Sequence, residues 1–129
     1  MRRMRVYVAG PYVTGTRGLE VLENIKEGIR VGHTLLWMGM APYIPWLDFQ
    51  LVLCQSQNCL SIEDYRENSL AYLEVSDVVF CHELRKCSEG TAKEIELACE
   101  LDVPIAMSWK ELMKFWEKWR YENSLSERS

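Results

Sequence analysis

The sequence predicts an α/β domain in which a parallel β-sheet is covered by helices on both faces. Short apolar segments alternate with longer segments of helical spacing, the order that right-handed β-α-β crossovers require. The apolar segments are also continuous, as in "DVVFC" at 77–81, and such strands are buried on both faces of a sheet. With 129 residues, 48% of them hydrophobic, the chain can form one globular domain, which we place at 1–121, followed by a disordered polar tail at 122–129.

Each predicted strand is a short apolar run bounded by glycine, proline or polar residues. The first, "RVYVAG", ends at the breaker Gly10-Pro11, and the second, "APYIP", has a proline near each end. The four segments predicted to be strands are 5–10, 41–45, 77–81 and 103–107.

The first predicted helix spans residues 19–38, because its apolar residues recur three, four or seven positions apart. Gly39 follows as a stop signal. We expect the buried face of this helix to be formed by Leu22, Ile25, Ile29 and Leu36.

The later helices are predicted from their start signals. Ser61-x-x-Asp64 and Ser108-x-x-Glu111 each place a hydroxyl three residues before a carboxylate, as at helix N-termini. A further helix is expected over residues 88–101, between the third and fourth strands.

Charge and hydropathy exclude several classes of partner. The net charge is −4 and no basic stripe offsets it, which argues against a nucleic-acid partner. No apolar run reaches the ~18 residues of a membrane span, and the N-terminus lacks the apolar region of a signal peptide. We therefore expect neither nucleic-acid nor membrane binding.

The five cysteines predict a cytoplasmic protein with reduced thiols. Their number is odd and no secretory signal precedes them, which is untypical of a disulfide framework. Their spacing also lacks the pattern of a zinc site, so that we expect no metal.

Two loops of unusual composition, residues 10–18 and 82–90, follow strands at the carboxyl edge of the predicted sheet. Ligands of open α/β sheets bind at this edge. Loop 82–90 brings Ser88, Gly90 and the N-terminus of the next helix together, a combination that binds anions such as phosphate. Spacing alone leaves a plain capped helix equally open.

Glu94 is the candidate for chemistry beside this loop. Thr91-x-x-Glu94 fits a capping box, which gives the carboxylate a purely structural role. Because an ionised carboxylate repels phosphate, a functional Glu94 has to face another part of the ligand. The sugar carbon that carries the base is such a part, where a carboxylate acts as nucleophile or stabilises a cation.

Four motifs together resemble the nucleoside 2-deoxyribosyltransferase family, including its 2′-deoxynucleoside 5′-phosphate N-hydrolase branch. They are "VYVAGPYVTG", "GMAPYIP", "SDVVF" and "SEGTAKEIELA", and the resemblance covers roughly residues 4–106. It implies a three-layer, flavodoxin-like (Rossmann-like) α/β/α sandwich with a parallel sheet of about five strands. It also implies a homodimer, a small-molecule nucleotide or nucleoside as ligand, and no cofactor.

The resemblance assigns roles to individual residues. Glu94 stands where the family's glutamate attacks the anomeric carbon, and Tyr7 where a tyrosine orients that glutamate. Ser88 stands where the N-hydrolases have a phosphate-binding serine, which favours a 5′-monophosphate. The supporting substrate contacts in the loops are Gly10, Pro11, Gly90 and Thr91.

One departure from the family lies in the helix before the third strand. The family's acidic residue, which helps to protonate or hold the leaving base, corresponds to Ser69 here. Trp46 and Asp48 follow the second strand, where a base could stack or an acid could substitute. Packing of Trp46 beneath a loop and a solvated charge at Asp48 are the alternatives.

These observations favour an N-glycosidase that releases the base from a (deoxy)nucleoside 5′-monophosphate. The first alternative is a nucleoside 2-deoxyribosyltransferase, which shares the same first half-reaction. A phosphoribohydrolase with a Gly-Gly-x-Gly-Thr-x-x-Glu motif is less favoured, because "EGTAKE" lacks the preceding glycine pair. The alternative from another class is a nucleotide-binding module without turnover, which Ser69 favours.

Overall fold

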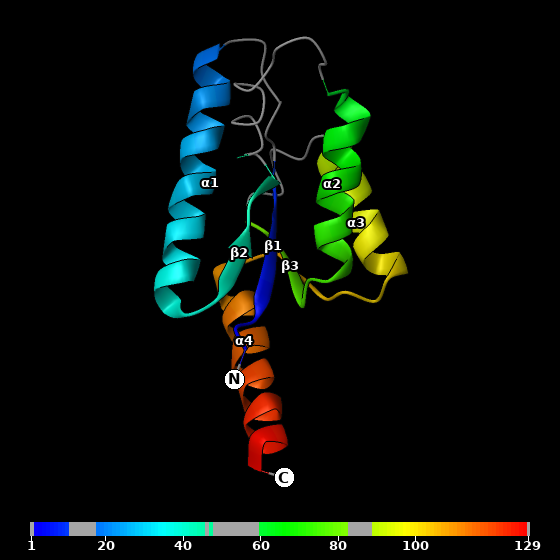
Figure 1. Ribbon diagram of the computed structural model, residues 1–129. Coiled ribbons are helices and arrows are strands. Elements are labelled where there is room, and N and C mark those ends of the chain that lie inside the picture. The colour runs from blue at the N-terminus through cyan, green and yellow to red at the C-terminus, as the bar shows by residue number, and fades with distance from the viewer. Residues whose placement is uncertain (1, 11–17, 46, 48–59, 83–88, 129) are drawn as a thin grey trace.

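The computed structural model describes residues 2–10, 18–45, 47, 60–82 and 89–128 (Figure 1). Strands and helices alternate along the chain, as the sequence predicts. The elements are β1 (Arg5–Ala9), α1 (Gly18–Met38), β2 (Ala41–Tyr43), α2 (Ile62–Glu74), β3 (Val78–Cys81), α3 (Glu89–Glu100), β4 (Ile105–Ala106) and α4 (Trp109–Arg128).

The sheet is fully parallel, with the strand order β2-β1-β3-β4. In its register, Tyr7 of β1 pairs with Tyr43 of β2 on one side and with Val79 of β3 on the other. The α/β class and the flavodoxin-like order are confirmed. The expectation of about five strands is wrong for the described residues, which form four. The chain after β4 turns into α4 and supplies no further strand.

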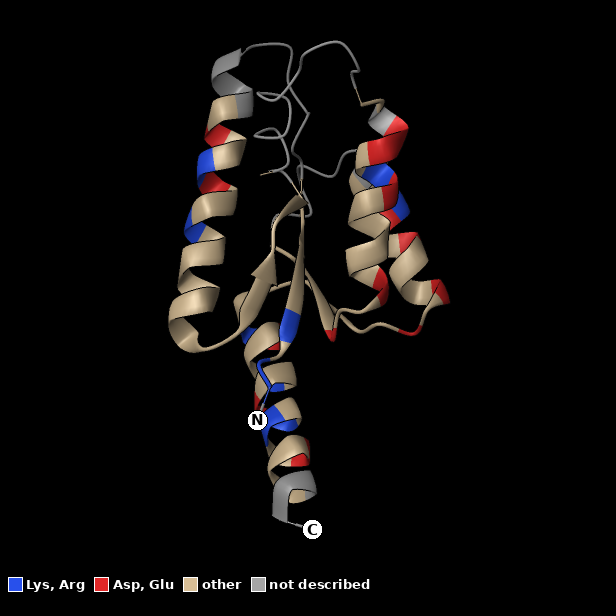
Figure 2. Ribbon diagram, in the orientation of Figure 1, with Lys and Arg blue, Asp and Glu red and all other residues tan. Residues whose placement is uncertain are grey.

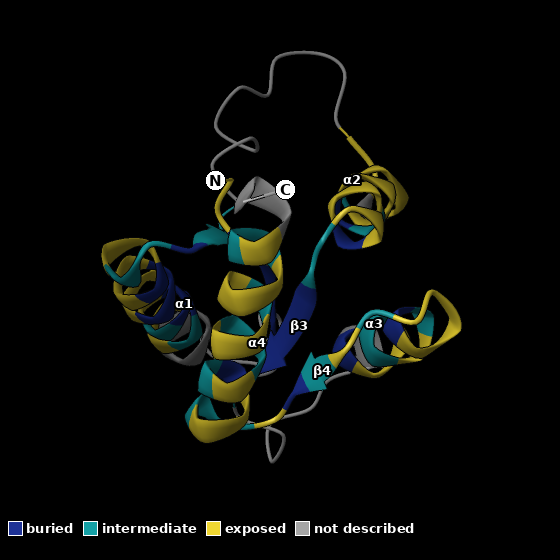
Figure 3. Cartoon of the chain, turned by 90° about the horizontal axis from the view of Figure 1, so that it is seen from below, coloured by how far each residue is buried: buried dark blue, intermediate teal, exposed yellow. Residues whose placement is uncertain are grey.

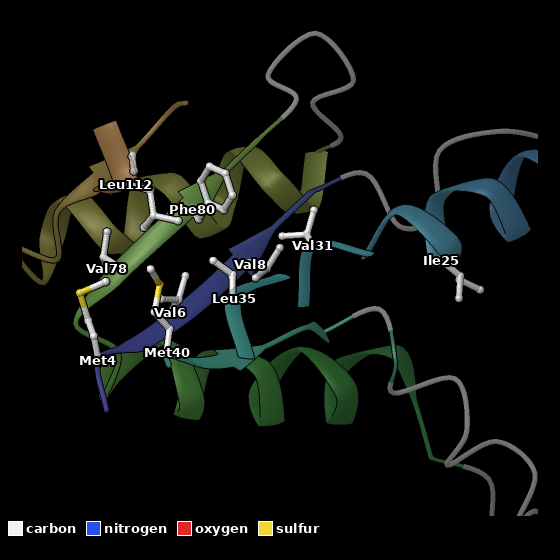
Figure 4. Close-up of a cluster of buried hydrophobic side chains, with 11 residues drawn as sticks. Met4, Val6, Val8, Ile25, Val31, Leu35, Met40, Val78, Phe80 and Leu112 are labelled. Carbon is white, nitrogen blue, oxygen red and sulfur yellow. The ribbon is translucent and has the colours of Figure 1, made fainter. Parts of the chain in front are cut away.

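Helices cover both faces of the sheet, α1 and α4 on one side and α2 and α3 on the other (Figures 1 and 3). Alternate residues of β1 and β3 therefore enter two separate cores. The larger core, shown in Figure 4, contains Met4, Val6, Val8, Ile25, Val31, Leu35, Met40, Val78, Phe80, Ala106 and Leu112. The smaller core, beneath α2 and α3, contains Tyr7, Ala9, Leu73, Val79 and Ala98.

Helix α1 buries a different face from the one that we predict. The buried face includes a glycine, Gly32, at which a Cβ atom would overlap the side chain of Ile44. This close approach selects one of two apolar stripes on the helix. The stripe that is buried contains Ile25, Val31 and Leu35. The stripe left exposed contains Leu22, Ile29 and Leu36, so that of the four residues predicted to be inside only Ile25 is buried.

The start of α2 confirms the predicted capping box. The Ser61 hydroxyl accepts a hydrogen bond from the Asp64 backbone N–H at 3.2 Å, and Asp64 accepts one from the Ser61 N–H at 2.7 Å. The hydrogen bond from the Ser61 backbone, and to a smaller extent that from its hydroxyl, holds the pKa of Asp64 below its usual value.

The capping box predicted for Thr91 and Glu94 is wrong. Helix α3 already begins at Glu89, so that Thr91 lies inside it and is not its N-cap.

The polar residues 122–128, predicted to be a disordered tail, instead continue α4 to Arg128. No glycine or proline interrupts this stretch, and the Asn123 side chain donates a hydrogen bond to the Trp119 carbonyl one turn earlier, at 2.8 Å. Two guanidinium groups lie over indole rings of the same helix, Arg2 over Trp119 and Arg120 over Trp116, 5.3 and 4.8 Å from the ring centroids. These contacts stabilise the helix beyond the edge of the sheet.

Asp77 joins the start of β3 to the N-terminal segment. Its carboxylate accepts a hydrogen bond from the Arg5 backbone N–H and two from the Arg2 guanidinium, each of 2.7 Å. Burial opposes ionisation, but the hydrogen bonds from Arg2 and Arg5 outweigh it and lower the pKa of Asp77. This is a structural role at the amino edge of the sheet.

Candidate active site

Three side chains from different elements meet beneath α2 and α3. Tyr7 comes from the middle of the central strand β1, and its side chain is completely buried. Glu94 comes from the second turn of α3, and Ser69, which is 8% exposed, from α2. Both influence the pKa of the Tyr7 hydroxyl, which shows that they lie beside it. The structure therefore brings together three residues that lie 25 to 87 positions apart in the chain. The sequence assigns all three to one site.

Burial strongly perturbs the carboxyl group of Glu94. Loss of hydration raises its pKa to about 7, and hydrogen bonding by Tyr7 acts in the opposite direction. The pKa of Tyr7 is raised in turn, first by burial and then by the charge of Glu94, so that Tyr7 remains a neutral donor. A carboxyl group whose pKa is near neutrality can exchange between its acid and its nucleophilic form at physiological pH.

Two buried oxygens at this site have no hydrogen-bond partner among the residues that the structure describes. Within the described residues, neither Oε2 of Glu94 nor the Tyr7 hydroxyl has a hydrogen-bond partner of standard geometry. The two groups are close enough to act on each other's pKa, but no well-formed hydrogen bond joins them. Buried polar atoms in native proteins are usually paired. Oε2 of Glu94 therefore has a hydrogen-bonding site that none of the described residues fills.

Ser69 provides a hydroxyl where the family resemblance leads one to expect a carboxylate. Its interaction with Tyr7 lowers the pKa of the phenol, against the effects of burial and of Glu94. The neighbouring residue, Asn68, is exposed and donates a hydrogen bond from Nδ2 to the Tyr43 hydroxyl, at 3.2 Å. The α2 side of the site thus offers neutral polar groups at both positions.

Tyr43 is a member of this cluster that sequence reasoning missed. It is the last residue of β2, and its ring centroid lies 5.6 Å from that of Tyr7. On its other side the ring stacks on Tyr72 of α2, with centroids 4.3 Å apart and planes inclined by 13°. The signal in the sequence is the aromatic residue of "APYIP", but its pairing with Tyr7 depends on the strand register.

A second group of polar side chains occupies the opposite face of the sheet. His82 follows β3, and its Nδ1 lies 3.7 Å from Oε1 of Glu27 in α1, while Oε2 of Glu27 accepts a 2.9 Å hydrogen bond from Arg30. The imidazole packs edge-on against Trp109, with ring centroids 5.7 Å apart. We find here the contacts of a packed histidine at a helix–strand junction.

The other predicted site residues lie at the ends of these elements or outside the described part of the chain. Gly10 directly follows β1, and Gly90 and the buried Thr91 lie in the first turn of α3. Among the residues that the structure describes, no group of three or more metal-binding side chains comes together. Nor is any described helix long and apolar enough to cross a membrane. The predictions that fall outside the described residues concern Pro11, Trp46, Asp48 and Ser88.

Comparison with known proteins relates the fold to one class of enzyme. No protein-family model matches the chain, and no curated protein matches its sequence. Among solved structures, a 2-deoxyribosyltransferase from Bacillus psychrosaccharolyticus matches with a TM-score of 0.57 and 20% identity, over 78% of this chain and 69% of its own. A 2-deoxyribosyltransferase from Leishmania mexicana matches with a TM-score of 0.54 and 18% identity, over 81% and 63%.

These likenesses establish the fold. The chain has the architecture of 2-deoxyribosyltransferases, as its motifs lead one to expect, and it spans about two thirds of the length of either relative. At this level of identity the activity has to be argued from the site itself.

Proposed function

We propose that this protein is an enzyme that cleaves the N-glycosidic bond of a nucleoside or nucleotide, with Glu94 as nucleophile. A carboxylate oxygen forms a bond to the anomeric carbon while the bond to the base nitrogen breaks, and the base leaves with the electron pair and takes up a proton. Water then hydrolyses the glycosyl ester and regenerates the carboxylate. The observation that carries this proposal is the buried Oε2 of Glu94 beside the Tyr7 hydroxyl, which has no hydrogen-bond partner in the described part of the chain.

The substrate that we favour is a (deoxy)nucleoside 5′-monophosphate, and the products are free base and sugar phosphate. In the sequence, Ser88 stands six residues before Glu94 and directly before α3. A serine and the positive end of a 12-residue helix together suit a phosphate group. Gly10, Pro11, Gly90 and Thr91 would line the same ligand, with Trp46 and Asp48 near the base.

Transfer of deoxyribose to a second base is the alternative activity. The structural neighbours that share the fold are described as 2-deoxyribosyltransferases, which supports it. Both activities use the same attack by Glu94 and differ only in whether water or a base accepts the sugar. A binding module without turnover is the third candidate, since Ser69 cannot act as a strong acid toward the leaving base.

A panel of nucleoside 5′-monophosphates and the corresponding nucleosides, assayed by chromatography for free base, separates these functions. We expect release from at least one monophosphate. The rate should rise with pH through an apparent pKa near 7, because only ionised Glu94 can attack and its pKa is about 7. A rate that is flat between pH 5.5 and 8.5 would contradict this assignment.

The same assay includes a second free base as acceptor. Formation of a new nucleoside in place of sugar phosphate identifies the transferase, whereas tight binding of one compound without release of its base identifies the binding module. In either case the favoured hydrolase activity is wrong.

We also propose that the protein is a cytoplasmic homodimer. The exposed stripe of α1 carries Leu22, Ile29 and Leu36 at seven-residue spacing, beside Trp37, which is 82% exposed. Such spacing is typical of helices that pack on another helix, and a two-fold axis would pair the stripe with itself.

Both signs of charge lie along the upper part of α1 (Figure 2), where Lys26 and Arg30 alternate with Glu23 and Glu27. Within the described residues neither Cys81 nor Cys99 forms a disulfide, as is usual for cytoplasmic proteins.

Substitution of Ile29 by Glu is expected to abolish the dimer, because it buries an unpaired charge at the centre of the stripe. Sedimentation velocity of the purified protein measures the change in mass. The matched control is Thr34→Glu, which adds the same charge to an exposed position outside the stripe and should leave the dimer intact. A wild-type protein that sediments as a monomer would refute the proposal.

A further inference from the structure

Among the described residues of α2, the face that the helix turns toward the sheet carries no carboxyl group. Its inward residues recur four positions apart, and they are the half-buried Tyr65 and the buried Ser69 and Leu73. Leu73 belongs to the same buried cluster as Tyr7, so this face of the helix is the one that covers the site. The acidic residues of α2 are all exposed, and they are Glu63, Asp64, Glu67 and Glu74.

The position next to Ser69 is neutral as well. Asn68 donates a hydrogen bond from Nδ2 to the Tyr43 hydroxyl, at 3.2 Å, and the Tyr43 ring centroid lies 5.6 Å from that of Tyr7. An amide nitrogen carries two N–H groups, and this hydrogen bond uses one of them. At the positions of Asn68 and Ser69, α2 therefore offers hydrogen-bond donors but no acid.

The rest of the described chain supplies no second carboxyl group at the site. Of the acidic residues whose burial the structure describes, only Glu27, Asp77 and Glu94 are not exposed. Glu27 lies on the opposite face of the sheet, beside His82, and Asp77 lies at the amino edge of the sheet, bound to Arg2. Glu94 is thus the one carboxyl group that the described residues bring to this site, and the proposed reaction uses it as the nucleophile.

The absence of a proton donor among these residues restricts the bases that can leave. A base that departs unprotonated keeps both electrons of the glycosidic bond and leaves as an anion, so that its rate depends on how well the ring holds the charge. Ring carbonyl groups spread that charge onto oxygen, where neutral N–H and O–H donors stabilise it. Adenine has no ring carbonyl group, and its departure relies on protonation of a ring nitrogen.

We propose that the substrate carries an oxo-base, of the uracil, thymine or hypoxanthine type, which leaves as an anion with a carbonyl oxygen held by Asn68 and Ser69. The bond from the anomeric carbon to the base nitrogen breaks, the nitrogen keeps the electron pair, and Glu94 becomes the glycosyl ester. Water protonates the base after it has left, and hydrolysis of the ester returns a proton to the solvent. This inference rests on the proposed function and adds the class of base to it.

The test is a series of 2′-deoxyuridine 5′-monophosphates that differ only at C5 of the ring. Fluorine withdraws electrons and stabilises the anion, a methyl group does the opposite, and both leave the ring carbonyl groups in place. We expect the 5-fluoro compound to release its base faster than the unsubstituted one by a factor on the order of 10 or more, because an unprotonated leaving group gives a steep Brønsted dependence. The 5-methyl compound should be the slowest.

The measurement is base release in a single turnover with the enzyme in excess, so that hydrolysis of the ester does not limit the observed rate. The monophosphates of deoxyinosine and deoxyadenosine make the same comparison for purines. The hypoxanthine compound should react faster than the adenine compound.

Ser69→Asp adds a carboxyl group to the inward face of α2, and Ser69→Asn is the matched neutral control of the same size. In Ser69→Asp the rates for the 5-fluoro and unsubstituted compounds should differ by no more than about threefold, because an acid then protonates the leaving base. Deoxyadenosine monophosphate should also react faster than in wild type. Ser69→Asn should retain the steep dependence of the wild-type protein.

The wild-type series is decisive even if Ser69→Asp fails to fold. Base release at equal rates from the three C5 compounds, or faster release of adenine than of hypoxanthine, would overturn the inference and leave the proposed function standing. A proton donor such as Asp48, which follows β2 in the sequence, would then have to act on the base. Release of base from none of the compounds would instead refute the proposed function itself.

Discussion

Glu94→Gln is expected to reduce the rate of base release by a factor on the order of 10³ or more, as the loss of a catalytic nucleophile does in other enzymes. Glutamine has nearly the same shape, but its neutral amide cannot form the glycosyl ester. Binding of the substrate should persist, because in the proposed complex Glu94 contacts the sugar and other groups hold the phosphate and the base. The measurement is free base by chromatography at saturating substrate, together with the dissociation constant by calorimetry.

Glu96→Gln is the control for this variant. Glu96 lies on the same helix two residues further on, and it is exposed, so that the same change of charge occurs away from the site. We expect its rate to equal that of wild type. A Glu94→Gln protein that is folded and retains the wild-type rate would show that the carboxylate is not the nucleophile.

Glu94→Gln should also make the protein more stable at pH 8. The pKa of Glu94 rises from 4.5, the ordinary value of a glutamate side chain, to about 7 in the folded protein, because burial disfavours the charge. Between these values the folded state binds more protons than the unfolded state, so that stability falls as the pH rises through this window. Above pH 7 the ionised side chain reduces the free energy of unfolding by up to about 3 kcal/mol, at 1.36 kcal/mol for each pKa unit.

Urea denaturation of wild type and Glu94→Gln at pH 4 and pH 8 measures this effect. The variant should exceed wild type by up to about 3 kcal/mol at pH 8 and by little at pH 4, where Glu94 is protonated in both states. Glu96→Gln should differ little from wild type at either pH, since its position is exposed. Equal stability of wild type and Glu94→Gln at pH 8 would show that Glu94 is not held in an unfavourable environment.

The two effects of this single substitution have opposite signs. A residue that only stabilises a helix would lower stability when it is replaced, whereas a residue kept for chemistry in a buried site can raise it. The combination of lost activity and gained stability would therefore distinguish a catalytic Glu94 from a glutamate that only stabilises its helix.

Local patterns in the sequence predict the elements of this fold well. β3 follows from the continuous apolar run at 77–81, and the start of α2 from Ser61 and Asp64, because each signal acts within a few residues. The buried face of α1 could not be predicted in this way. Two of its stripes are apolar, and the choice between them depends on the fit of Gly32 against Ile44, a contact made only in the folded chain.

The residues of the site also divide into those that local motifs predict and those that depend on contacts in the folded chain. Tyr7 and Glu94 could be paired from motifs, and the structure places them together. Tyr43 could not, because its approach to Tyr7 is set by the register between β1 and β2, and its orientation by Asn68 from a third element. Contacts among three separate segments have no signature in any one of them.

The edges of the sheet have a consequence for how this protein can associate. β2, at one edge, has three residues, and the middle one, Pro42, has no N–H to donate to an added strand. β4, at the other edge, has two residues. Edges as short as these give another chain little backbone with which to pair. The described sheet is thus poorly suited to growth by strand addition, which favours helix surfaces over sheet edges as a route to assembly.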